Sequence, residues 1–189
     1  MRFLERASAG RVGVCNPCGV TLESATAHSM QIRFTRLTNE RHRLEFIRAD
    51  GTSETHELET RSTLLHDLVH FAVETEAALK ASFYGRLASG TTYETLLIEP
   101  PTSPEAMQTE VVVGRIQGIA KNDAWSGIDP ISLAASMAAS FRAVGQEPPV
   151  WLTGELLVRV RERLRRVQGE WRATPGQGSR HQLRHYVAD

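Results

Sequence analysis

Residues 65–74 read LHDLVHFAVE, and the interpretation of the whole chain starts from this stretch. Its apolar residues recur at the 3.6-residue spacing of an amphipathic helix. The sequence predicts that this helix begins at a cap on Ser62 or Thr63 and runs to about Ala88, before Gly90. One face of the helix carries Leu65, Leu68, Val69, Ala72, Glu76, Leu79 and Phe83. We expect this face to pack on a sheet, which makes the helix the central element of the fold.

Two histidines lie four residues apart in this stretch, His66 and His70. That spacing lets two imidazoles on one helix bind the same metal ion. Helix geometry places both on the flank of the apolar face, and Glu74 further round towards solvent. His66 and Glu74 are about 12 Å apart along the helix axis. The sequence therefore predicts a site for zinc or another divalent transition metal that uses His66 with His70, or His70 with Glu74. The alternative is that the two histidines only cap polar groups at the edge of the core.

A third metal ligand has to come from outside the helix, because two ligands hold zinc weakly. His56 is the first candidate and His42 the second, since both precede the helix on predicted strands, on faces that carry apolar neighbours. Asp67 occupies the place of the Glu in the zinc-hydrolase signature HExxH, where that Glu is the general base. Asp67 and Glu74 are thus the candidate catalytic residues. In other interpretations Asp67 orients an imidazole or favours the helix dipole.

The segments HDLVHFAVE (66–74) and FYGRLASG (83–90) resemble a pattern in small uncharacterised bacterial proteins, where such a helix ends in a glycine-containing turn. The resemblance covers Met30 to Gly90. It implies a bacterial origin and supplies no reaction. The similarity to the HExxH zincins is limited to five residues, with the catalytic Glu replaced by Asp67.

Three strands are predicted before the central helix. Apolar and polar residues alternate in segments 31–35 and 43–46, which are joined by the polar connection 38–41. Asp50-Gly51 is a strong hairpin signal that leads to a third strand over 53–58.

After Gly90 the chain reads as a loop through Pro100-Pro101, followed by about three more helices. These are expected at Pro104–Lys121, at Ile131–Val144 and from a cap at Thr153 to Arg172, with a short strand at 111–113 as an alternative. The predicted fold class is α+β, a small antiparallel three-stranded sheet packed by the central helix and followed by these helices.

The length of 189 residues favours one domain, assigned to residues 30–173. Residues 1–29 lack periodic apolar positions and are expected to be a disordered, dispensable extension, or an over-long start upstream of Met30. Cys15 and Cys18 have the spacing of a zinc half-site or redox pair, but no matching pair follows and we interpret them as incidental. Residues 174–189 are expected to form a flexible tail.

The charge and hydropathy of the chain argue against nucleic acid and membranes as partners. Lys+Arg and Asp+Glu are equal at 22 each, so no global charge favours nucleic acid, and the arginines of the last helix form too diffuse a stripe for readout. No apolar run reaches the roughly 20 residues of a membrane span. Two cysteines close together agree with a reducing compartment, so a cytoplasmic location is expected.

Two function classes follow from these observations. The first is a metal-binding protein, hydrolase-like at most, with His66, His70 and His56 as ligands. The second is a non-enzymatic interaction or oligomerisation protein that uses helix 153–172. In that helix the a/d spacing from Leu157 to Trp171 favours packing on the same domain over a homodimer seam. The sequence does not decide whether the protein is an enzyme.

Overall fold

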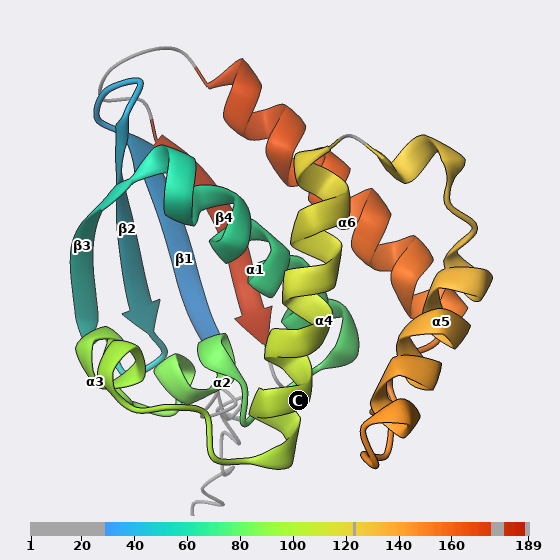
Figure 1. The fold of residues 1–189 in the computed structure, drawn as a ribbon. Coiled ribbons are helices and arrows are strands. Elements are labelled where there is room, and N and C mark those ends of the chain that lie inside the picture. The colour runs from blue at the N-terminus through green and yellow to red at the C-terminus, as the bar shows by residue number, and fades with distance from the viewer. Residues whose placement is uncertain (1–28, 123, 175–179, 188–189) are drawn as a thin grey trace, which may run out of the picture.

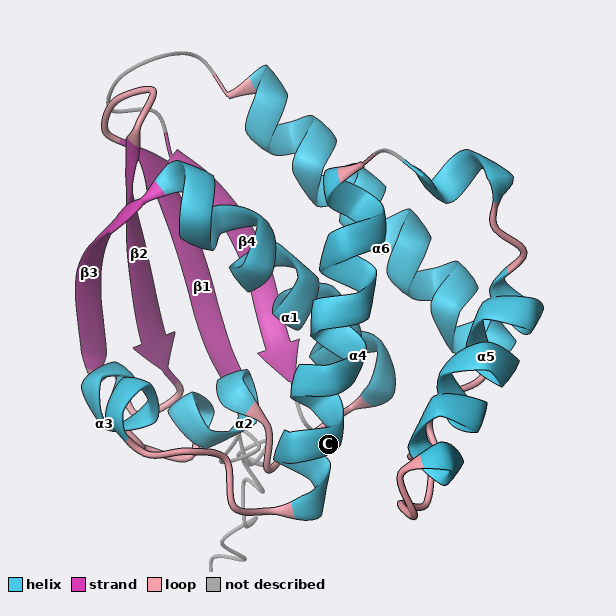
Figure 2. Ribbon diagram, viewed as in Figure 1, coloured by secondary structure: helices cyan, strands magenta, loops and turns pink. Residues whose placement is uncertain are grey.

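A computed structural model describes residues 29–122, 124–174 and 180–187 of the chain, and it confirms the α+β class. An antiparallel sheet forms one layer and the helices form the other (Figures 1 and 2). The strands are β1 (Ser29–Arg36), β2 (Arg41–Arg48), β3 (Ser53–Glu59) and β4 (Arg180–Val187), in the spatial order β3-β2-β1-β4. The first three are the predicted strands, and Gly51 takes the positive φ of 85° that the β2–β3 turn requires.

The fourth strand corrects the prediction of a flexible tail. Residues 180–187 pair with β1 in antiparallel register, which places β1 in the interior of the sheet. This segment lacks the alternation of apolar and polar residues by which β1 and β2 were predicted. Its pairing is explained instead by the backbone N–H and C=O groups of β1, which would have no partner on that side without it.

The residues on one face of β1 and β2 form the sheet side of the hydrophobic core. Ile32 lies opposite Phe46, Phe34 lies opposite Leu44, and all four are fully buried. The alternation of polar and apolar residues therefore directs every second side chain towards the helices. Helix α1 (Leu65–Ala77) follows a short π-helical turn (Thr60–Leu64) and lies over the sheet in Figure 1.

The central helix is shorter than predicted. It ends at Ala77 because Ala78 adopts the left-handed conformation, with φ of 51°, and the chain then turns back. The segment expected to continue it forms the separate helix α2 (Phe83–Ala88). Helix α3 (Tyr93–Ile98) occupies the segment expected to be a loop, capped by the Thr92 side chain.

The remaining helices lie where the sequence predicts them. They are α4 (Pro104–Lys121), α5 (Pro130–Ala143) and α6 (Gly154–Ala173), with a short 3₁₀ turn at Ala124–Gly127 between the first two. Helices α4 and α6 pack against α1, and α5 packs against α6 (Figure 1). The apolar seam of α6 is buried in this chain: Leu157, Val160, Leu164, Val167 and Trp171. The seam considered for a homodimer is thus used inside the domain, as the favoured interpretation expected.

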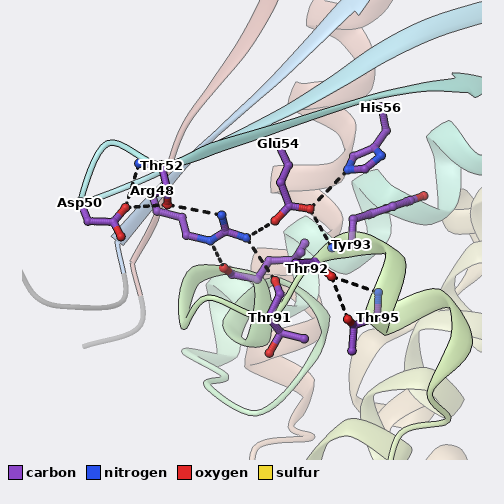
Figure 3. Close-up of polar contacts among 10 residues, drawn as sticks. Arg48, Asp50, Thr52, Glu54, His56, Thr91, Thr92, Tyr93 and Thr95 are labelled. Atoms are coloured by element: carbon purple, nitrogen blue, oxygen red, sulfur yellow. Dashed lines mark hydrogen bonds and ion pairs between the residues drawn. The ribbon is translucent and has the colours of Figure 1, made fainter.

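A buried arginine ties the β2–β3 hairpin to the turn between α2 and α3 (Figure 3). Arg48 donates to the carbonyl oxygens of Leu87 and Thr91 at 2.6 and 3.1 Å, and forms an ion pair with Glu54. Glu54 in turn accepts a hydrogen bond of 2.9 Å from the Tyr93 amide. This network fixes the small helices at one end of the sheet.

None of the helices within the described residues combines the length and apolar character that a membrane span requires.

Candidate metal centre

Helix α1 brings His66 and His70 together on one side, as their spacing predicts. Their ring centroids are 4.5 Å apart. His70 is 1% exposed, whereas His66 is only partly buried, so the pair lies at the boundary of the core. The packing of α4 against α1 covers this boundary.

Helix α4 supplies the third candidate ligand, Glu110. Its Oε1 lies 3.4 Å from Nε2 of His70. One ligand atom each from His66, His70 and Glu110 lie within 4.8 Å of one another, and no other such group occurs among the described residues. Ligands bound to zinc at about 2.0–2.2 Å in a tetrahedron are about 3.4 Å apart. The cluster therefore needs only a small contraction to hold one ion.

The two histidines are oriented through their Nδ1 atoms. Nδ1 of His70 lies 2.8 Å from Oε1 of Glu74, and Nδ1 of His66 lies 3.3 Å from Oε1 of Gln117. A carboxylate and an amide oxygen only accept hydrogen bonds, so each Nδ1 carries the proton. Each ring therefore turns Nε2 away from its orienting partner, the arrangement that metal-binding histidines use.

Glu74 is fully buried, and the prediction that it lies towards solvent is wrong. Its Oε2 accepts hydrogen bonds from the amides of Tyr84 and Gly85, at 2.8 and 3.4 Å. The helix was expected to continue past residue 78. Its early end instead brings the first turn of α2 onto the Glu74 carboxylate. Glu74 thus binds Nδ1 of His70 and is not on the Nε2 side of the ring, where a shared ion would lie.

The Nε2 atom of His70 is a buried polar atom without a satisfactory partner. It makes no hydrogen bond of good geometry among the described residues, although the Glu110 carboxylate is at ion-pair distance. Buried polar atoms in native proteins are normally satisfied, so such an atom requires an explanation. A metal ion bound between His70 and Glu110 would supply it.

The charges differ between the two rings. Desolvation lowers the pKa of His66, and the neighbouring His70 adds to this, so His66 keeps a free Nε2 lone pair at neutral pH. Desolvation also acts to lower the pKa of His70, but Glu110 and Glu74 outweigh it and raise this pKa to about 9. His70 is therefore protonated and positively charged at neutral pH. Its charge lies between two carboxylates, at a place where a metal cation would also be stabilised.

Asp67, predicted as a catalytic residue, lies in the interior at 4% exposure. The hydroxyl of Tyr84 donates to its backbone carbonyl at 3.2 Å, and burial raises the pKa of the Asp67 carboxyl to about 7. The charge of His70 acts on the Asp67 carboxyl, but Asp67 is not part of the His66–His70–Glu110 group.

The structure does not bring the two strand histidines into the cluster. Nε2 of His56 lies 3.5 Å from Oε2 of Glu54, and its ring stacks on Tyr93 at 4.3 Å, within the network of Figure 3. His42 is buried between Phe34 and Trp171. Neither belongs to the His66–His70–Glu110 group. Cys15 and Cys18 lie outside the described residues.

Glu110 was missed because nothing near the two histidines in the sequence points to it. A weak signal exists in α4, where Glu110 and Gln117 are seven residues apart and thus share one side of the helix. Both lie on the flank of its buried face, the position that His66 and His70 hold on α1.

Comparison of the chain with models of protein families, with curated proteins and with solved structures gave no match. The functional argument therefore rests on the geometry of the cluster.

Proposed function

We propose that this protein binds one divalent transition-metal ion through Nε2 of His66, Nε2 of His70 and the carboxylate of Glu110. The observation that carries the proposal is the convergence of three donors, since one ligand atom each of His66, His70 and Glu110 lie within 4.8 Å of one another and Nε2 of His70 is buried 3.4 Å from Oε1 of Glu110. The Nδ1 contacts to Glu74 and Gln117 support it, because they keep a proton on Nδ1 of both rings. Nε2 is then the nitrogen left for a metal ion, which on the charged His70 takes the place of the second proton.

The donor set favours zinc. Two imidazoles and one carboxylate are the ligands of a major class of catalytic zinc sites, which keep a fourth position open for water. Fe²⁺ uses the same three donors in another class of enzymes, so the titration below compares both ions. Bound zinc acts as a Lewis acid and lowers the pKa of its water to about 7.

Access from solvent is consistent with an open position. The Glu110 side chain is 42% exposed, so the cluster reaches the protein surface at α4. Asp67 is not part of this outer side, and the proposal gives it no role as general base. The proposed function is therefore metal binding at a site open to water, which a metal-dependent hydrolase would require.

Zinc titration in competition with a chromophoric chelator tests the proposal, with Fe²⁺ titrated separately without oxygen. Wild type should bind one equivalent. His66→Ala and Glu110→Ala should lose affinity by at least about 100-fold, more than the 10–100-fold typical for loss of an orienting residue. His56→Ala is the matched control, since it removes an imidazole outside the cluster. Absence of stoichiometric binding in the wild type, or equal losses in all three variants, would reject the site.

A further inference from the structure

A second candidate site lies between α1 and α6, and it depends on observations independent of the metal centre. The surface there has a hollow of about 300 Å³, lined by Glu76, Arg159, Glu162, Arg163 and Arg166. Every residue of the lining is charged. The three arginines are on successive turns of α6, so their side chains share one side of the helix.

Glu76 fixes two of these arginines in place. Nε of Arg163 donates to Oε1 of Glu76, and Nε of Arg159 donates to Oε2 at 3.0 Å. The Arg163 guanidinium also lies over the Phe71 ring, 5.7 Å from its centroid. Folding has therefore already ordered the Arg163 side chain, which reduces the entropic cost of binding a ligand there.

The ordered guanidinium of Arg163 has unused donors. Both of its Nη groups lack a hydrogen-bond acceptor among residues 29–122 and 124–174, since only Nε is engaged. Arg166 is 61% exposed and makes only a long contact of 3.9 Å with Glu170, so its guanidinium can turn towards a ligand. Three arginines and two glutamates give the hollow a formal charge of about +1.

We propose that this hollow binds a single phosphate group of a small ligand, either free phosphate or a phosphate monoester. Guanidinium groups bind phosphate oxygens through paired, charge-assisted hydrogen bonds. Arg163 supplies the fixed pair of donors and Arg166 the adjustable pair. Glu76 and Glu162 beside them disfavour a run of phosphates, so the hollow suits one dianion and not a nucleic-acid strand.

The test is a titration with inorganic phosphate, followed by calorimetry or ³¹P NMR, at constant ionic strength and with a chelator present. The chelator excludes phosphate bound through a metal ion. Arg166→Gln should weaken phosphate binding by about 10-fold or more, the value expected for a charge-assisted bond. Arg163→Gln should do the same. Glu162→Gln should strengthen binding, because it removes a competing negative charge from the lining.

Arg165→Gln is the matched control, because it makes the same charge change at an exposed residue outside the lining, about 100° round α6 from Arg166. Weakening in Arg166→Gln but not in Arg165→Gln supports the site. Equal weakening in both, or a phosphate response no larger than that of chloride, overturns it. Glycerol phosphate measured in parallel identifies the source: tighter binding than inorganic phosphate assigns a monoester, and weaker binding assigns free phosphate.

Discussion

The two ring nitrogens of His70 have different surroundings. Nδ1 is hydrogen-bonded to a fully buried carboxylate, while Nε2 is buried without a hydrogen bond of good geometry. Nε2 of His42 and Nε2 of His56 are also buried without a hydrogen bond, so this feature alone does not identify a ligand. The residue-level argument is that a second imidazole and the Glu110 carboxylate converge beside Nε2 of His70, while Glu74 holds the ring by Nδ1.

Glu74→Gln should weaken zinc binding by about 10–100-fold, the usual effect of removing an orienting carboxylate. His70 and the Tyr84 amide donate to different oxygens of Glu74, and Gln replaces one of these oxygens with an NH₂ group, which cannot accept. We also expect the free energy of unfolding to fall by about 1–3 kcal/mol. Chelator competition and urea unfolding measure the two effects, with the exposed Glu94→Gln as control. A variant that is destabilised but binds zinc normally would assign Glu74 a structural role alone.

His42 should make the stability of the protein depend on pH below neutrality. Desolvation lowers its pKa in the folded state to about 4, against about 6.5 when unfolded. Between these values the unfolded state binds more protons, so stability is full above pH 6.5 and is lost as the pH falls towards 4. The slope from this residue is at most about 1.4 kcal/mol per pH unit.

Urea unfolding of wild type and His42→Gln at several pH values isolates this contribution, because other titrating groups are common to both. The free energy of unfolding of the wild type minus that of His42→Gln should shrink or change sign as the pH falls from 6.5 to 4. A difference that stays constant over this range would show that His42 does not titrate as described.

At the scale of elements, the local patterns of the sequence predicted the helices and the β2–β3 turn, but not the chain reversal after α1. The i, i+4 spacing placed His66 and His70 on one helix, and α4, α5 and α6 begin within a residue of their predicted starts. The break at Ala78 was not predictable, because alanine favours helix and rarely adopts positive φ. That one reversal buries Glu74 under α2, so its role could not be read from helical periodicity.

The Arg48–Glu54 network should contribute far more to stability than the exposed ion pairs on the same sheet. Arg48→Met leaves Glu54 and the Leu87 carbonyl without their partner in a buried place. We expect the free energy of unfolding to fall by about 3–5 kcal/mol, as it does when one partner of a buried ion pair is removed. Arg43→Met breaks an exposed ion pair with Glu57 and should lower the free energy of unfolding by about 1 kcal/mol or less. Similar losses in both variants would show that the network does not anchor the hairpin.

At the scale of the whole molecule, segments far apart in the sequence complete both the sheet and the site. Glu110 comes from the helix that packs on α1, and β4 comes from the end of the chain to pair with β1. Neither contact has a sequence signal near its partner, since each depends on how the elements pack. Sequence periodicity therefore gave two of the three candidate ligands and three of the four strands, whereas the remaining ligand and strand required the tertiary structure.

Removal of the residues after Thr174 should destabilise the protein, because it deletes β4 and leaves the backbone edge of β1 unpaired. We expect a lower urea midpoint, faster hydrogen exchange at the amides of β1 and a tendency to aggregate. A chain that ends at Val187 is the control. Unchanged exchange in β1 after the longer deletion would favour the flexible tail that the sequence suggested.

The most direct test of the metal site is a crystal structure of the protein soaked in zinc, with diffraction data on both sides of the zinc absorption edge. We expect one anomalous peak between α1 and α4, about 2.0–2.2 Å from Nε2 of His66, Nε2 of His70 and a Glu110 oxygen. Nδ1 of His70 should stay on Glu74. A strong peak at other residues, coordination through Nδ1, or no peak at this cluster would contradict the account.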